Sequence, residues 1–273
     1  MILKDFERFL YHIPTAVGTE ESAIKPYWEE AENRLKTELL GESLYAHIEN
    51  LNTGDIVVIA ETVVSLWAYQ LAIPFADLIQ TPTGFGIVNN QNLVPASKDR
   101  VDRLIEQTKF RLSISRDALI RIVFNDDELR GLWSEFELFE QFTSIVYITG
   151  SDLSRFSNTK VIFGTLDSSR TNILQLQDEL SKYISPEYIT TLFMKFRNAG
   201  MHEYDKKVFL QMQIIIGLML QKLEVYPMIE KLVNYMVENI EQFPDFETSQ
   251  AYKLKIGSKY ENRLSDRTFF FGG

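Results

Sequence analysis

The side chains of this sequence that could take part in catalysis or metal binding are three histidines and a few clusters of carboxylates. His12, His47 and His202 lie far apart, whereas a histidine metal site or a catalytic triad needs partners at usable spacing, such as two histidines one helical turn apart. His202-Glu203 resembles half of a zinc-protease motif, but Lys206 stands where the second ligand belongs. The pattern therefore favours capping or surface roles for the histidines.

Asp126-Asp127-Glu128 is the densest carboxylate cluster in the sequence. Clustered carboxylates can hold magnesium. They also supply the negative charge that a helix N-terminus prefers, and we expect Asp127 or Asn125 to cap the helix that follows. The capping interpretation is favoured over the metal site.

Other catalytic signatures are missing from the sequence. Gly84-Phe85-Gly86 lacks the preceding buried strand and the following helix that a dinucleotide-binding loop requires. There is no Gly-x-Ser-x-Gly elbow and no Walker lysine motif, and the absence of cysteine excludes disulfides, thiolate metal sites and cysteine nucleophiles. We therefore predict a protein that is not an enzyme and has no catalytic residues, no metal site and no cofactor.

Composition indicates a folded globular protein. Of the 273 residues, 45% are hydrophobic and 24% are charged, which is ordinary for such proteins. The net charge of −10 disfavours sustained nucleic-acid binding, although it suits DNA passing through an acidic channel. No signal-peptide h-region follows Met1, and the apolar stretch 56–73 carries Glu61 and Gln70, so we expect neither secretion nor a membrane span.

Helical periodicity dominates the chain. Pro26 fits the first turn of a helix that ends near Leu40, with Gly41 as its C-cap. Asn52 or Thr53 is expected to cap the next helix, which is apolar on nearly all sides like the central helix of a bundle, and Ser97 to cap a later long one. The expected helices cover about residues 26–40, 55–73, 98–124, 128–139, 172–183, 186–197, 204–223 and 228–242.

The remaining segments are predicted to be non-helical. Residues 79–94 combine glycines, asparagines and short apolar pieces, which is typical of a β-hairpin, with Pro82 at an edge. Residues 150–170 suggest a linker with one short strand at 161–163, and the chain from Asp245 onward lacks a helical period.

The predicted fold class is therefore mainly α: a helical bundle with an inserted β-hairpin and an extended C-terminal tail. We expect a first helical part at 1–150, carrying the projecting β-hairpin at about 78–95, and a second helical half with the tail at 151–273. A single composite domain remains an alternative.

Several short motifs of the chain form a recognisable set: Trp67, Asp77-Leu78, Thr83 to Val88, Ala96 to Asp102, Tyr260 to Arg263 and Thr268 to Gly272. Together they resemble an uncharacterised family encoded in phages and prophages of Bacteroidota. That family looks like a relative of head–tail connector (adaptor) proteins, which are small helical bundles with a hairpin or loop projection that assemble as a ring beneath the portal. This chain departs from the common adaptors by its second helical half.

The resemblance implies a structural virion protein of a tailed phage, a connector ring bridging portal and tail. Its partners would be copies of itself, the portal protein and other neck or tail proteins, with genomic DNA passing through the lumen without specific binding and no membrane contact. It would be made in the host bacterial cytoplasm and reside in the neck of the virion. The alternatives are a non-structural helical protein-binding factor of a phage and, less favoured, an enzyme with an unfamiliar site.

Ring contacts between subunits need elements that reach the neighbouring copy. Exposed sheet edges can add a strand, and aromatic residues on loops and tails are common anchors of protein contacts. The hairpin and the tail are therefore the predicted interaction segments. Their candidate residues are Thr83, Gly84, Phe85, Gly86, Asn89, Phe269, Phe270 and Phe271.

Overall fold

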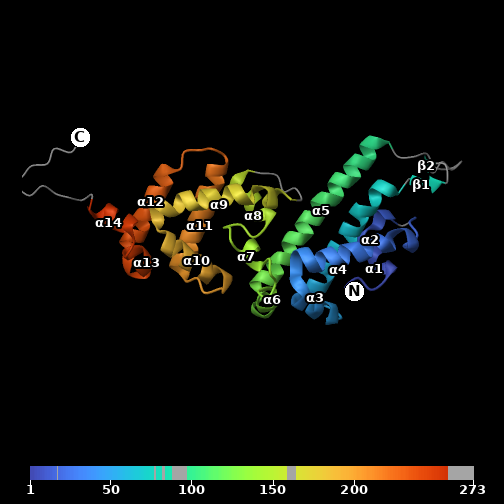
Figure 1. The fold of residues 1–273 in the computed structure, drawn as a ribbon, viewed down its shortest axis with the longest axis horizontal. Coiled ribbons are helices and arrows are strands. Elements are labelled where there is room, and N and C mark those ends of the chain that lie inside the picture. Colours follow the sequence, from blue (N-terminus) through green and yellow to red (C-terminus); the bar gives the residue numbers. More distant parts are fainter. Residues whose placement is uncertain (17, 77, 82–83, 88–96, 159–163, 258–273) are drawn as a thin grey trace, which may run out of the picture. The chain divides into compact units, whose positions relative to one another are not determined.

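A computed structural model describes residues 1–16, 18–76, 78–81, 84–87, 97–158 and 164–257 of the chain (Figure 1). The chain divides into two compact units. Unit 1 contains residues 1–143 and 147–169, and unit 2 contains residues 144–146 and 170–273. The boundary expected after residue 150 thus falls inside unit 1, and the boundary in the structure lies within a helix.

Unit 1 is built around one apolar helix, α4. Helices α1, α2 and α5 pack against it, and residues such as Val63, Val64 and Ala68 are fully buried. A helix that is apolar on nearly all sides is expected at the centre of a bundle, so this prediction is confirmed. The elements are α1 (Phe6–His12), η1 (Pro14–Ala16), α2 (Glu21–Arg34), η2 (Leu35–Leu40), α3 (Gly41–Asn50), α4 (Asp55–Ala72), η3 (Ile73–Phe75), β1 (Leu78–Thr81), β2 (Gly84–Ile87), α5 (Lys98–Asn125), α6 (Asp127–Trp133), α7 (Phe139–Phe142) and α8 (Gly150–Ser157).

By length and composition, Asp55–Phe75 could cross a membrane, with a mean hydropathy of 1.8. However, 67% of this apolar window is buried inside the protein. The carboxylate of Glu61 also lies within 3.3 Å of the Arg8 guanidinium. A buried helix with an ion pair in its middle favours the core-helix interpretation of the sequence.

The prediction that Gly41 caps a helix ending at Leu40 is confirmed, since η2 ends at Leu40 and Gly41, with a φ of +76°, is its C-cap. Helix α2 begins at Glu21 and runs directly into the π-helical turn η2, and Gly41 is also the first residue of α3. A π-turn disturbs the backbone ladder, and here the indole N–H of Trp133 on α6 donates a hydrogen bond of 2.8 Å to the carbonyl of Leu39. The hydrogen bond from Trp133 therefore stabilises this turn. Sequence periodicity does not reveal such a tertiary contact.

Of the two capping predictions for unit 1, one is wrong, because Gly54 rather than Asn52 or Thr53 occupies the N-cap of α4. Ser97 is the N-cap residue of α5 as predicted, although its side chain makes no capping hydrogen bond. The lengths of α4 and α5 agree with the sequence prediction, because apolar periodicity defines them independently of the caps.

The linker predicted at 150–170 is wrong for its first half, which forms α8. The side chain of Thr149 caps this helix by accepting a hydrogen bond from the amide of Asp152 at 3.1 Å. A helix of this length with several serines has the composition of a loop, so only its cap could have revealed it. The strand predicted at 161–163 lies outside the described residues.

The mainly α character of the predicted fold class is confirmed, but the inserted β-hairpin as a part of the fold is wrong. Extended structure among the described residues is limited to one short ladder, in which β1 pairs antiparallel with β2 from Leu78↔Ile87 to Thr81↔Gly84. An isolated two-stranded ladder is marginally stable and builds no layer of the fold. Pro82, predicted to occupy an edge position, lies outside the described residues.

Unit 2 is a second set of helices with its own core, which includes Ile184, Leu192 and Ile216. The helix predicted at 186–197 is confirmed, and its cap Ser185 accepts a hydrogen bond from the amide of Tyr188 at 3.1 Å. The elements are α9 (Thr165–Ile184, of which residues 170 onward belong to unit 2), α10 (Pro186–Arg197), α11 (Glu203–Leu220), α12 (Tyr226–Glu238), η4 (Ile240–Gln242), α13 (Pro244–Glu247) and α14 (Gln250–Gly257).

The prediction of a non-helical tail beginning at Asp245 is wrong as far as Gly257. Helices α13 and α14 continue the fold, anchored by the buried ring of Phe246, whose centroid lies 5.4 Å from that of Tyr252. α14 has no amphipathic period and no buried residue, so helical pattern recognition could not find it. The rest of the predicted tail lies outside the described residues.

Candidate functional site

The interaction residues predicted from the sequence are not tested by the structure. Residues 84–86 fall in β2, where only the backbone is described, and residues 83, 89 and 269–271 lie outside the described parts of the chain. They stay predictions. The described residues instead bring together three polar clusters and several surface grooves that the sequence did not reveal.

The first cluster joins α1 to α4 around the buried Glu61. Its carboxylate lies 3.4 Å from Nε2 of His12 and 3.3 Å from Nε of Arg8. The hydroxyl of Thr62 lies 3.0 Å from Nδ1 of His12, and Arg111 of α5 donates to the backbone carbonyl of His12 at 3.3 Å. Since His12 is only 6% exposed, the surface role expected for it is wrong.

Burial lowers the pKa of His12, because an imidazolium is poorly solvated there. The carboxylate of Glu61 opposes this shift, whereas the cations of Arg8 and Arg111 add to it. The cluster therefore holds a histidine that favours its neutral form next to a carboxylate whose charge Arg8 compensates. Glu61 and His12 are almost closed off from solvent, so this arrangement serves to dock α1 on the core.

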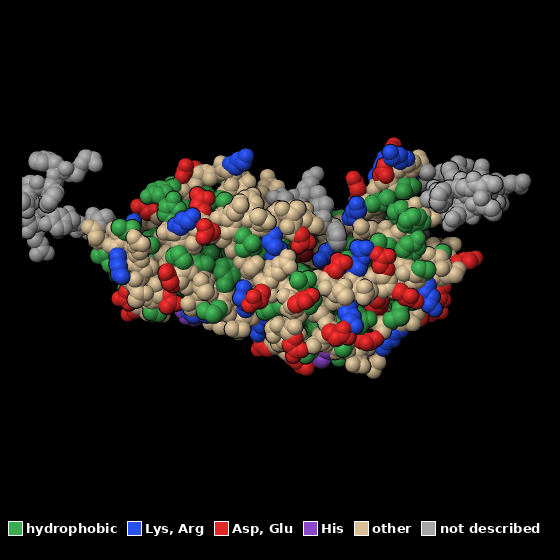
Figure 2. Space-filling view, in the orientation of Figure 1, with side chains coloured by type: hydrophobic (Ala, Val, Ile, Leu, Met, Phe, Trp, Pro, Cys, Tyr) green, Lys and Arg blue, Asp and Glu red, His purple; other side chains and the backbone are tan. Residues whose placement is uncertain are grey.

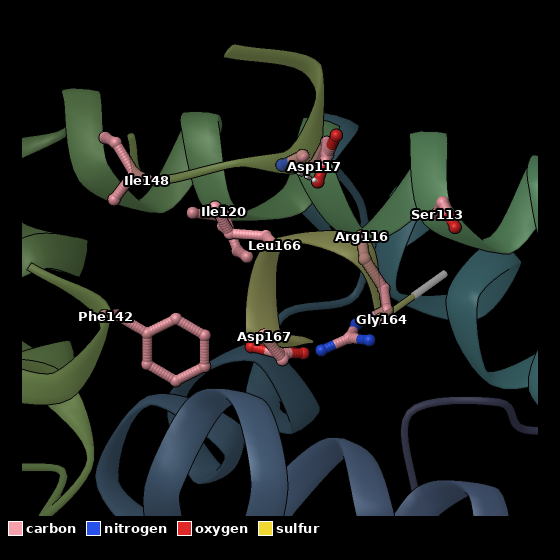
Figure 3. A pocket seen from close by; sticks show the side chains of 10 residues that line it. Ser113, Arg116, Asp117, Ile120, Phe142, Ile148, Gly164, Leu166 and Asp167 are labelled. Carbon is pink, nitrogen blue, oxygen red and sulfur yellow. Dashed lines mark hydrogen bonds between the residues drawn. The ribbon is translucent and has the colours of Figure 1, made fainter. Parts of the chain in front are cut away.

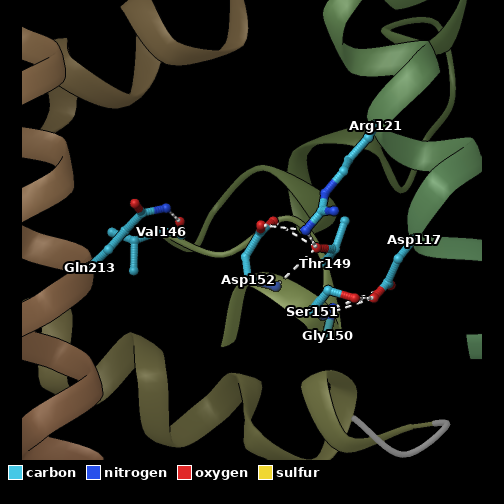
Figure 4. A network of polar contacts seen from close by, with 8 residues as sticks. All are labelled: Asp117, Arg121, Val146, Thr149, Gly150, Ser151, Asp152 and Gln213. Atoms are coloured by element: carbon cyan, nitrogen blue, oxygen red, sulfur yellow. Dashed lines mark hydrogen bonds and ion pairs between the residues drawn. The ribbon is translucent and has the colours of Figure 1, made fainter. Parts of the chain in front are cut away.

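The second cluster fixes the start of α8 to α5 (Figure 4). The buried carboxylate of Asp117 accepts hydrogen bonds from the amide and hydroxyl of Ser151, at 2.7 and 2.5 Å, and from the amide of Gly150 at 3.3 Å. Next to it, Arg121 donates to the carboxylate of Asp152 at 2.8 Å. Burial raises the pKa of Asp117, and the hydrogen bonds from residues 150 and 151 counteract that shift.

A small cavity lies beside this cluster, under α5 (Figure 3). Its volume of about 40 Å³ suits one or two water molecules rather than a substrate. Figure 3 shows the guanidinium of Arg116 and the carboxylate of Asp167 turned toward one another across it. Burial lowers the pKa of Arg116, and the negative charge of Asp167 opposes that shift.

The third cluster, in unit 2, surrounds the fully buried Asp205. Its carboxylate accepts hydrogen bonds from Lys195 at 2.9 Å and from the hydroxyl of Tyr188 at 3.0 Å, while Nε2 of His202 lies 3.2 Å away. His202 also caps α11 by accepting from the amide of Asp205, which confirms the capping interpretation for this histidine. The cluster ties α10 to α11.

The carboxylates at 126–128 also cap a helix. Asp126, rather than Asp127 or Asn125, is the N-cap residue of α6, and its side chain accepts hydrogen bonds of 3.0 Å from the amides of Glu128 and Leu129. Among the residues that the structure describes, no group of three or more metal-ligating side chains lies together. The prediction that this cluster caps a helix is confirmed, but the capping residue is Asp126 and not Asp127 or Asn125.

Two of these clusters had a signal in the sequence. Glu61 interrupts an otherwise apolar helix, and a carboxylate buried in that way needs a partner. Asp117 sits on the buried face of α5 among apolar residues, which is a weaker form of the same signal. Neither signal identifies the partner, because that depends on which helices pack together.

Apolar surface gathers where α4 ends and α5 begins (Figure 2). A groove of about 270 Å³ lies there. Phe75, which comes between the lining residues Pro74 and Ala76 in the chain, is 57% exposed and stacks on Tyr27 with ring centroids 6.0 Å apart. We name this the α4–α5 groove. Its lining residues are Thr19, Ile24, Tyr69, Ala72, Ile73, Pro74, Ala76, Val101 and Leu104.

Residues 20–122 match the model of a family of unknown function, DUF6712. The match covers less than half of the chain and runs from the start of α2 into α5, so it contains the α4–α5 groove almost entirely. No curated protein and no solved structure matches the chain. What is similar between this chain and that family is therefore the core of unit 1.

Proposed function

We propose that this chain is a structural protein of a tailed-phage virion that forms a head–tail connector ring between portal and tail. The proposal is supported by the resemblance carried by residues 67–102, a stretch that runs through the end of α4 and the start of α5. A non-enzymatic role agrees with the polar clusters described above, each of which joins one helix to another.

The observation that carries a binding role is the exposed apolar surface at the α4–α5 groove. Large exposed apolar groups that cluster on a folded protein mark contact surfaces with other proteins. Further along α5, Phe110 and Ile114 are 45% and 44% exposed and lie one helical turn apart. Two apolar surfaces on one helical frame are what a subunit needs to contact a neighbour.

The proposed partners are copies of the chain itself, the portal protein and other neck or tail proteins. Genomic DNA would pass through the lumen without specific binding, which the net charge of −10 supports because phosphate binding requires a basic face. The chain would be made in the host bacterial cytoplasm and reside in the virion neck.

Quantitative mass spectrometry of purified, nuclease-treated phage particles tests this proposal. We expect the copy number of this chain to stand in a simple ratio to that of the portal protein. Absence from the particle would contradict the connector role and favour a non-structural protein-binding factor, to be sought by pull-down from infected cells.

A matched pair of variants tests the α4–α5 groove. Phe75→Asp places a charge between the lining residues Pro74 and Ala76 and should abolish incorporation into particles while leaving the helical circular dichroism unchanged. Val58→Asp is the control, because Val58 is 41% exposed on α4 and does not line the groove. Equal incorporation of both variants would show that the groove is not the contact surface.

A further inference from the structure

A second groove lies in unit 2, between the end of α9, α12 and α14. Its volume is about 360 Å³, within the range of about 300–1,000 Å³ typical of ligand pockets. We name it the α12–α14 groove. Its lining includes Tyr183, Tyr226, Ile229, Val233 and Leu254.

Large exposed apolar side chains line this groove. Tyr183, Tyr226 and Leu254 are 44%, 59% and 66% exposed, and hydrophobic side chains reach the surface over α12 in Figure 2. Side chains of this kind, in one concave site, are typical anchors for an apolar segment.

The charges at the rim are already compensated inside unit 2. Nζ of Lys182 lies 3.2 Å from the carboxylate of Asp178, and Nζ of Lys255 lies 3.7 Å from that of Glu230. A charged ligand would have to displace these pairs, whereas an uncharged apolar ligand would not. The groove therefore favours an occupant without charges.

We propose that the α12–α14 groove is the docking site for Phe269–Phe271 of the same chain. The segment 268–273 has the sequence Thr-Phe-Phe-Phe-Gly-Gly and carries no charged side chain. Residues 258–268 connect it to α14, which itself lines the groove, and a connection of that length spans up to about 40 Å. The three rings can thus reach the groove from Gly257.

The same chain is the favoured source of the occupant. A short connection holds a tethered segment at an effective concentration on the order of millimolar, well above that of the same segment on a second free copy. Docking would cover the exposed rings of Tyr183 and Tyr226 in the free protein. This inference concerns the free chain and does not depend on the proposed virion role.

Photo-crosslinking of the full chain tests the proposal. A benzophenone amino acid replaces Phe270, and dilute protein, mixed from ¹⁴N- and ¹⁵N-labelled batches, is irradiated and digested for mass spectrometry. We expect crosslinks to the peptides that contain Tyr183, Tyr226 or Leu254, with both halves carrying the same isotope. Crosslinks with mixed isotopes would overturn the proposal in favour of docking on a second copy. Crosslinks to other surfaces only, or no crosslinks, would overturn the assignment of the α12–α14 groove as the docking site.

A protease assay gives an independent measurement. Chymotrypsin cleavage after residues 269–271 should accelerate about tenfold or more when Leu254→Asp removes the apolar wall of the groove. Leu223→Asp is the matched control, because Leu223 is 52% exposed and does not line the groove. Equal cleavage rates for the wild type and Leu254→Asp, or equal acceleration by both variants, would contradict the proposal.

Discussion

His12 and Glu61 lie side by side in the core of unit 1, and their protonation is linked to its stability. Burial holds the pKa of His12 below its ordinary value of 6.5. Below pH 6.5, His12 therefore binds a proton in the unfolded chain but stays neutral in the folded chain. The stability contributed by neutral His12 is complete above 6.5 and is lost as the pH falls toward the lowered pKa.

We expect the free energy of unfolding to decrease between pH 7.5 and pH 5.5 by up to about 1.4 kcal/mol, because one pH unit of this range lies below the ordinary pKa of histidine. His12→Gln removes the titrating group and should decrease less over the same range. Urea unfolding at both pH values measures the difference. An identical decrease in both proteins would contradict the role assigned to His12.

Gly41 is the second residue whose identity the structure explains. Its φ of +76° belongs to a region that other residues rarely adopt, and a Cβ atom would lie 2.7 Å from Cβ of Phe136. Gly41→Ala should therefore lower the free energy of unfolding by about 2–4 kcal/mol, as measured by urea unfolding.

Gly131→Ala is the control for this prediction. Gly131 lies within α6, and an added Cβ would meet no atom within 4 Å. We expect this variant to be more stable than the wild type by about 0.5–1 kcal/mol, because alanine loses less entropy than glycine in a helix. Similar losses in both variants would show that space at Gly41 is not the cause.

Among the elements, α8 depends on a side chain from α5. Asp117→Ala would leave the amides of Gly150 and Ser151 without their buried acceptor, at a cost of about 1–3 kcal/mol. The amides at the start of α8 should then exchange with deuterium faster than in the wild type, as measured by hydrogen-exchange mass spectrometry.

Asp126→Ala provides the comparison, since Asp126 also accepts from backbone amides but caps α6. Its loss should cost about 1 kcal/mol and accelerate exchange in α6 alone. If Asp117→Ala left the exchange of α8 unchanged, the carboxylate would not be what holds this helix.

At the scale of the whole molecule, unit 2 is discontinuous in sequence. The short segment 144–146 is held there by two glutamines: Gln177 accepts from the amide of Val146 at 2.8 Å, and Gln213 donates to its carbonyl at 2.7 Å (Figure 4). Ile145 and Val146 are fully buried. The segment therefore acts as part of the core of unit 2.

We expect the fragment 144–257 to unfold at a higher temperature than the fragment 170–257, because burial of each aliphatic side chain contributes about 1.5–3 kcal/mol. The fragment 147–257 separates this effect from chain length, since it keeps residues 147–169 but lacks the buried segment, and it should behave like 170–257. Equal melting temperatures of all three, measured by circular dichroism, would contradict the assignment of residues 144–146 to this core.

Apolar periodicity in the sequence determined the mainly α character and the long helices. The core helix α4 and the long helix α5 were predicted because their patterns extend over many turns. The helix at 186–197 was predicted as well, and its start is defined locally, because Ser185 and Pro186 act on the adjacent backbone. Local interactions over a few residues were sufficient for each of these elements.

Tertiary structure alone decided the rest. The π-helical turn before Gly41 depends on Trp133, and the start of α8 depends on Asp117, so each is fixed by a residue distant in the sequence. The short helices α13 and α14 have no pattern of their own, and the division of the chain places residues 144–146 with helices that begin later. Apolar periodicity predicts which face of a helix is buried. The features named here depend instead on which other element packs against that face.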